Sequence, residues 1–206
     1  LGYLRVDQAR FGWDPDKEKG YLAALEIGDR ALRLDPNYGE IYTIIGYANI
    51  FQRRFADAVS AAEKAVALSP NSVDAFHMSS MPHIFAGNFR VGRDYLRQAI
   101  RLSPIANENS LTELARVQFH LGAYQESSKL AAQVIENEPR WLTAQTILLA
   151  ALWKLGREEE VIKTVSSIIE VSPNFSVKRW SDLWPYKNNS DLENLMNPLE
   201  KAGLSM

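Results

Sequence analysis

The sequence predicts an all-α fold, a right-handed superhelix of about five helical hairpins followed by a C-terminal capping pair of helices. The first observation is a series of prolines spaced 34, 34, 35 and 34 residues apart: Pro36, Pro70, Pro104, Pro139 and Pro173. The second is that an apolar, helix-like stretch precedes each of them. Proline cannot continue a helix, because it lacks the backbone donor and collides with the preceding turn. A helix stop that recurs at this interval indicates a two-helix unit used repeatedly.

The composition of the chain limits the kinds of function that can be expected. The chain has 206 residues, of which 46% are hydrophobic, so it can bury a continuous core. Its net charge of −2 gives no electrostatic reason to expect nucleic acid or a membrane surface as partner. The absence of cysteine excludes disulfides, thiolate metal sites and a cysteine nucleophile, and it is typical of a reducing compartment such as the cytoplasm. No apolar run approaches the roughly 20 residues that span a bilayer.

The first unit, about residues 1–38, is expected to be irregular. Its first helix is predicted over Leu1–Phe11, and a long turn over Gly12–Lys19 follows. Its second helix is more regular, with small residues Ala24, Gly28 and Ala31 on one face. Because the chain opens inside a helix and without an initiator methionine, we expect it to be part of a longer protein.

The second unit, residues 39–72, carries the clearest pattern. Bulky Tyr42 and small Gly46 share the predicted first helix, and small residues at 58, 62 and 65 line one face of the second. Small residues let two helices cross closely, and a bulky replacement there would cost about 1–3 kcal/mol. This alternation of large and small residues, closed by Pro70, resembles the tetratricopeptide repeat. The resemblance extends over about residues 1–174 and implies pairs of antiparallel helices, A and B.

Three further units are expected over about residues 73–107, 108–141 and 142–175. Glycines at 87, 122 and 156 fall where the turn between helices A and B requires a left-handed residue. Arg53 holds this place in the second unit, so its turn is predicted to be strained or differently shaped. Pro82 lies inside a predicted A helix. It is either a tolerated kink near a helix end or a kink that widens the groove.

Residues 175–206 are predicted to be capping helices, since a solenoid needs a cover for its last repeat. One helix is expected over Phe175–Trp184, with Trp180 and Trp184 on one face to cover that repeat. A break at Pro185 precedes a last helix over Leu192–Lys201.

No constellation for chemistry is present in the sequence. It lacks phosphate-binding glycine loops, the HExxH zinc helix and the GxSxG nucleophile elbow. The histidines at 77, 83 and 120 are poorly spaced for a shared metal ion. We therefore expect no catalytic residue, no cofactor and no metal, and we interpret this chain as a non-enzyme.

The tetratricopeptide resemblance implies that helix A residues line a concave groove for a protein or peptide ligand. The aromatic, Met, His and Arg residues at those places form the predicted partner site: Tyr47, Phe51, His77, Met81, Phe85, Arg116, His120 and Trp153. Such side chains suit a peptide or helix ligand. The alternative is that they pack internally or against the chain's own terminal segment. The Lys/Asn/Arg clamp by which some relatives bind chaperone tails is absent, since the matching places hold Thr43, Ile44, Tyr47, His77 and Met78.

A second resemblance concerns the parent protein. The segments Trp184–Lys187, Asp191–Glu193 and Leu199–Leu204 are similar to the C-terminus of bacterial multidomain signalling proteins. Those proteins join a class III adenylate or guanylate cyclase domain, or a winged-helix DNA-binding domain, to a tetratricopeptide array. The resemblance implies a regulatory or scaffolding part of a bacterial cytoplasmic cyclase-like protein, and the alternative is a partner-binding part of a transcriptional regulator. It leaves the ligand and the oligomeric state open.

Overall fold

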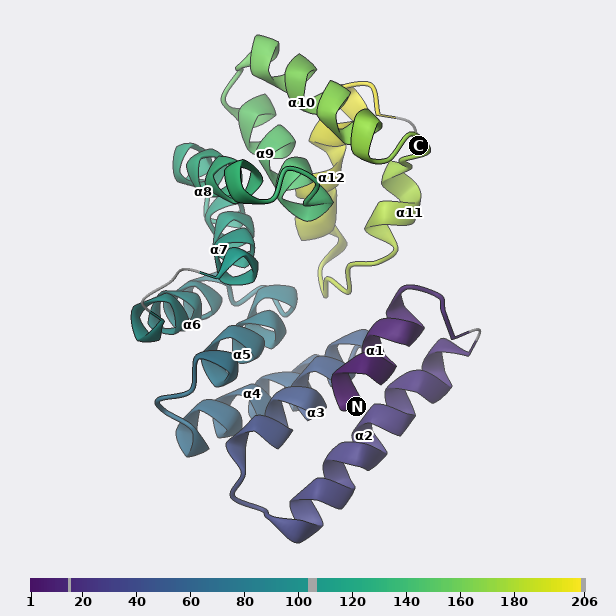
Figure 1. Cartoon of the computed structure of the whole chain (residues 1–206), viewed down its shortest axis with the longest axis vertical. Coiled ribbons are helices and arrows are strands. Elements are labelled where there is room, and N and C mark those ends of the chain that lie inside the picture. The colour runs from purple at the N-terminus through teal and green to yellow at the C-terminus, as the bar shows by residue number, and fades with distance from the viewer. Residues whose placement is uncertain (15, 104–106, 205–206) are drawn as a thin grey trace. The chain divides into compact units, whose positions relative to one another are not determined.

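The computed structural model describes residues 1–14, 16–103 and 107–204, and these contain only helices and connecting segments (Figure 1). The chain divides into two compact units. The first unit holds residues 1–104 together with Pro185–Lys187, and the second holds residues 105–184 and 188–206. No described helix combines the length and the apolar character needed to cross a bilayer.

The described residues of the first unit form six helices that pair as three hairpins. In chain order these are α1 (Gly2–Arg10), α2 (Lys17–Leu34), α3 (Gly39–Phe51), α4 (Phe55–Leu68), α5 (Val73–Phe85) and α6 (Phe89–Leu102). Helices α1 and α3 pack together, as do α3 and α5, so the A helices form one continuous layer of the unit.

In the second unit, the residues that the structure describes form two hairpins and two terminal helices. In chain order these are α7 (Glu108–His120), α8 (Tyr124–Asn137), α9 (Leu142–Lys154), α10 (Glu158–Val171), α11 (Val177–Ser181) and α12 (Asn189–Lys201). Helix α12 packs against α9 and α7, which are the two A helices of this unit.

Small residues set the close approach inside each hairpin. Ala58, Ala62 and Ala65 of α4 are all fully buried. A Cβ added at Gly46 of α3 would lie 3.3 Å from the Ala58 carbonyl oxygen, tighter than ordinary van der Waals contact. The small residues therefore lie where the sequence pattern predicts, and they let the backbones of the two helices approach closely.

Prolines and left-handed residues mark the turns as expected. Prolines 36, 70, 139 and 173 each lie in a turn two residues after a helix ends, whereas Pro104 lies outside the described residues. Gly87, Gly122 and Gly156 have φ of 88°, 79° and 71°. Arg53 has φ of 60° at the same place, so the second hairpin uses a left-handed turn despite lacking glycine.

Pro82 lies inside α5 and is buried. Its ring approaches Gly46 of α3, where an added Cβ would lie 3.4 Å from the Pro82 Cγ. The helix extends three residues beyond it to Phe85. The proline is thus part of the packing between two A helices near a helix end.

The C-terminal segment differs from the prediction in its boundaries. The helix expected over Phe175–Trp184 spans only Val177–Ser181, because the Ser176 side chain caps its start and the chain turns from Asp182 onward. Trp184 therefore leaves the helix, although its ring still lies 5.6 Å from that of Trp180. The last helix begins at Asn189, three residues earlier than expected, and ends before Gly203, whose φ is 94°.

Candidate functional site

The eight residues of the predicted partner site are divided between the units. Residues 47, 51, 77, 81 and 85 lie in the first unit, and residues 116, 120 and 153 lie in the second. Most of them are buried or half-buried, and Trp153 alone among the eight is exposed, at 38%. Their role as a partner site stays a prediction.

Tyr47 is held by a polar network inside the first unit. Its hydroxyl donates to Asp7 Oδ1 at 3.0 Å and accepts from Arg10 Nη1 at 3.1 Å. Its ring contacts Tyr3 and Phe51. Desolvation, the largest cause, raises the pKa of Tyr47 far above its usual value. These contacts tie α1 to α3.

The next A helix contributes residues of mixed accessibility. On α5, His77 is half-buried, whereas Met81 and Phe85 are buried at 7% and 1% exposure. The Phe85 ring makes an edge-to-face contact with Tyr186, at 5.0 Å between centroids. Phe85 is therefore covered by another residue of the first unit.

In the second unit, Arg116 is fully buried. Its Nε donates to Glu113 Oε2 at 2.8 Å, and its guanidinium lies 3.9 Å from the centroid of the Trp184 ring. Desolvation is the main cause that lowers the pKa of His120 to about 3, and the nearby charge of Arg116 lowers it further. Arg116 thus forms a buried polar cluster with Glu113 and Trp184, and the half-buried His120 lies within reach of its charge.

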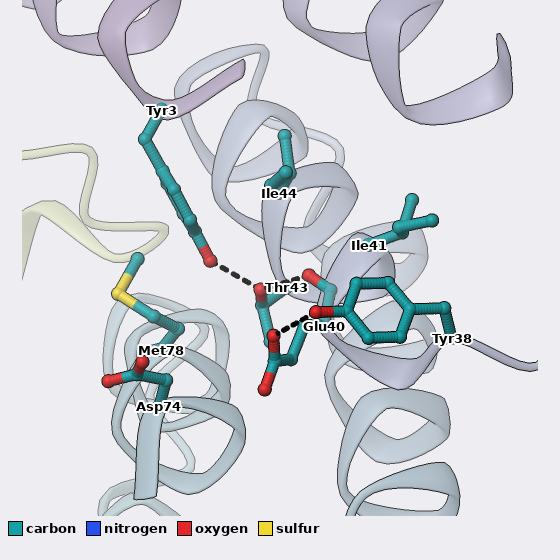
Figure 2. Close-up of a pocket in the computed structure, with 8 residues that line it drawn as sticks. All are labelled: Tyr3, Tyr38, Glu40, Ile41, Thr43, Ile44, Asp74 and Met78. Atoms are coloured by element: carbon teal, nitrogen blue, oxygen red, sulfur yellow. Dashed lines mark hydrogen bonds between the residues drawn. The ribbon is translucent and has the colours of Figure 1, made fainter. Parts of the chain in front are cut away.

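An open pocket of about 350 Å³ lies on the layer of A helices in the first unit (Figure 2). Helices α1, α3 and α5 and the residue before α3 supply its eight lining residues: Tyr3, Tyr38, Glu40, Ile41, Thr43, Ile44, Asp74 and Met78. Thr43 and Asp74 occupy positions that the repeat pattern assigns to the concave face. Tyr3 and Tyr38 lie outside the well-matched repeat positions, so sequence reasoning did not indicate them.

Hydrogen bonds fix the polar side of this pocket. The Tyr3 hydroxyl points at the Thr43 hydroxyl and is hydrogen-bonded to it, and Thr43 donates to the Glu40 carbonyl oxygen at 2.5 Å (Figure 2). The Glu40 carboxylate accepts from the Tyr38 hydroxyl at 2.7 Å and from the Ser72 hydroxyl at 3.1 Å. Both carboxylate oxygens of Glu40 are therefore positioned by side chains.

The pocket is electronegative. Burial is the main cause that raises the pKa of Tyr3 to about 12; the hydrogen bond to Thr43 opposes it, and the charges of Asp74 and Glu40 add to it. No lysine, arginine or histidine is among the lining residues. Ile44 and Met78 provide apolar surface beside the two carboxylates. Such a site suits a ligand group with an apolar stem and a cationic head.

Metal chemistry has no visible basis in the described part of the chain. No three or more His, Asp or Glu side chains there converge closely enough to hold a metal ion. The pocket's two carboxylates come with hydroxyls and apolar side chains, an arrangement that suits an organic ligand.

Comparison with known proteins supports this architecture. The profile of the tetratricopeptide repeat family matches residues 39–72, which are the α3–α4 hairpin and its closing turn. The crystal structure of PilW, described as a widely conserved type IV pilus biogenesis factor, is similar at a TM-score of 0.72 and 10% identity, covering 98% of this chain and 88% of that one. A crystal structure of MamA is similar at a TM-score of 0.63 and 19% identity, covering 75% of this chain and 90% of that one.

A third similar structure is YrrB, described as a TPR protein with an unusual peptide-binding site. It has a TM-score of 0.60 and 15% identity, with 85% of this chain and 90% of that one covered. A search of curated protein sequences finds no match. At these identities the likeness establishes the fold: the prediction of an all-α fold of tetratricopeptide type is confirmed.

Proposed function

We propose that this chain is a protein-recognition domain that binds a cationic segment of a partner protein in the pocket of the first unit. A tetratricopeptide fold supports partner binding as the general role. The observation that carries the specific proposal is the pocket itself, in which Glu40 and Asp74 lie beside the apolar side chains of Ile44 and Met78. An extended peptide that places an arginine or lysine there would bury the aliphatic stem and pair the charged head with the carboxylates.

The charge of the pocket also explains what it rejects. The sequence predicts that a clamp for a C-terminal carboxylate is absent, and three of the matching places hold Thr43, Ile44 and Met78, which line this pocket. An acidic peptide would meet two like charges there, which disfavours binding. Cationic selectivity therefore separates this domain from relatives that bind acidic tails.

Matched peptides test this proposal. Four octapeptides that differ only in a central Arg, Lys, Gln or Glu are titrated into the full chain by calorimetry. We expect Arg and Lys to bind at least tenfold more tightly than Gln, and Glu to bind weakest. The double variant Glu40→Gln/Asp74→Asn should remove this preference, since it keeps the side-chain shapes and removes both charges.

A charge-matched control uses exposed carboxylates of α10. The double variant Glu158→Gln/Glu159→Gln changes the net charge by the same amount and should bind as the wild type does. Equal affinity for Arg and Gln peptides, or unchanged selectivity in the pocket variant, would contradict the assignment of the pocket.

For the cellular role, we propose that the domain is the regulatory or scaffolding part of a bacterial, cytoplasmic, nucleotide cyclase-type signalling protein. What supports this is the sequence similarity over Trp184–Lys187, Asp191–Glu193 and Leu199–Leu204, where the chain resembles the C-termini of such proteins. A winged-helix transcriptional regulator is the second candidate, on the same residues. The coding sequence adjacent to this domain distinguishes the two, because only a cyclase domain would supply paired metal-binding aspartates.

A further inference from the structure

The turn of the second hairpin contains an arginine in a backbone conformation that usually requires glycine. Arg53 has φ of 60° and is the one residue other than glycine with a left-handed backbone among those the structure describes. The equivalent turns after α5, α7 and α9 use Gly87, Gly122 and Gly156. A left-handed conformation costs an arginine energy that glycine would avoid. Such strain is often retained where the side chain has a specific task.

The Arg53 side chain reaches a distant part of the same unit. Its Nη2 donates to the backbone carbonyl oxygen of Tyr186 at 2.8 Å, across 133 residues of sequence. The guanidinium also lies 5.5 Å from the centroid of the Phe55 ring. An arginine at this turn therefore holds the non-helical segment Pro185–Lys187, a contact that glycine could not make.

The second contact to this segment comes from the end of α5. The Lys187 amide donates to the Phe85 carbonyl oxygen at 2.8 Å. This carbonyl belongs to the last turn of α5, where carbonyl groups lack partners within their own helix. The Tyr186 ring packs edge-on against the Phe85 ring and is 2% exposed, while Lys187 is exposed to solvent. Arg53 and Phe85 thus bind the segment at three points, which are one carbonyl, one amide and one aromatic side chain.

We propose that Arg53 and Phe85 form a peptide-binding site that is filled in cis by Pro185–Lys187. The site binds the backbone of a non-helical segment through one donor and one acceptor, and it binds an aromatic side chain through Phe85. When the segment leaves, the same site takes another non-helical segment with an aromatic residue at the Tyr186 position. This site is separate from the acidic pocket, whose lining residues it does not share, so either proposal can fail alone.

Hydrogen exchange of the full chain tests whether Arg53 holds the segment. In Arg53→Gly, the backbone strain is removed and the guanidinium is lost, so the protein is expected to fold. The Lys187 amide should then exchange at least tenfold faster than in the wild type. The Asn88 amide, which donates to the His83 carbonyl oxygen at 2.8 Å, serves as the internal control and should not change. Unchanged exchange at Lys187 would overturn the role of Arg53.

Peptide binding tests whether the site accepts a ligand in trans. The probe is a fluorescein-labelled heptapeptide with the sequence of residues 183–189, measured by anisotropy. It should bind the full-length Arg53-containing variant Tyr186→Ala at least tenfold more tightly than the wild type, whose site is filled. A peptide with alanine at the tyrosine position should not bind.

Equal affinity for wild type and Tyr186→Ala would overturn the ligand site. If Tyr186→Ala does not fold, Lys187→Pro replaces it, because proline removes the amide that bonds to Phe85. The expected and contradicting results are then the same.

Discussion

In the first unit, the layer formed by α1, α3 and α5 leaves an open pocket with Glu40 and Asp74, whereas in the second unit α12 packs against the A helices α7 and α9. The second unit buries an ion pair on this layer. Arg116 is 1% exposed and pairs with Glu113, which is 7% exposed. The layer of A helices therefore lines a cavity in the first unit and packs against a helix of the same chain in the second.

This difference shows what a repeat position can and cannot determine. Its place on helix A decides which layer a side chain belongs to. Whether that layer binds a partner depends on what the rest of the chain lays over it, and in the second unit the C-terminal helix covers it. A hydrogen bond joins the two layers there: Lys154 Nζ of α9 donates to the side-chain oxygen of Asn194 of α12 at 2.7 Å.

Removing the buried cation of the second unit should have the largest effect. In Arg116→Met, the Glu113 carboxylate stays buried without its partner. We expect the free energy of unfolding to fall by about 3–5 kcal/mol. Urea unfolding followed by tryptophan fluorescence measures this, because Trp184 stacks on Arg116.

Two controls sharpen this prediction. The double variant Arg116→Met/Glu113→Leu removes both charges and should recover most of the lost stability. Arg157→Met breaks an exposed pair with Glu160 and should cost less than about 1 kcal/mol. A small effect of Arg116→Met would mean that Glu113 reaches water, and the contrast between the units would weaken.

Protonation of His120 at acid pH should destabilise the second unit, by less than the loss of Arg116 does. Its pKa in the folded protein is about 3, below the usual value of 6.5, because of desolvation and the nearby Arg116. The stabilisation from a neutral His120 is fully present above pH 6.5 and is lost as the pH falls from 6.5 towards 3. The expected loss is roughly 1.4 kcal/mol per pH unit inside this range, or about 2 kcal/mol by pH 5.

The matched variant is His120→Gln, which cannot take up a proton. Its free energy of unfolding should fall less steeply between pH 7 and 5 than that of the wild type. Part of the slope should remain, since desolvation also lowers the pKa of His83 in the first unit, against the opposing charge of Glu63. An unchanged slope would show that His120 is not responsible.

The sequence alone predicted the repeating hairpins well, because proline stops and alanine crossings act locally. Residues 39–72 show this most clearly, where Gly46 lies close to the Ala58 carbonyl oxygen and Ala58, Ala62 and Ala65 are fully buried. Sequence could not predict the pocket, because Tyr3 and Tyr38 lie outside the regular pattern. Tyr3 reaches the pocket only through the packing of α1 on α3, and Tyr38 is the residue before α3. Nor could periodicity show that Trp184 covers Arg116, since Trp184 leaves its helix in a non-repeating segment.

The smallest predicted effect concerns the left-handed turns between helices A and B. Gly122 has φ of 79°, and nothing lies within 4 Å of a Cβ added there. Gly122→Ala should therefore cost only the backbone penalty, about 1 kcal/mol of unfolding free energy. Gly122→Asn should cost less, because asparagine tolerates the left-handed region. Equal costs for both variants would indicate steric crowding instead. In the first unit, Arg53 carries this penalty at the equivalent turn, where its side chain donates to the Tyr186 carbonyl oxygen at 2.8 Å.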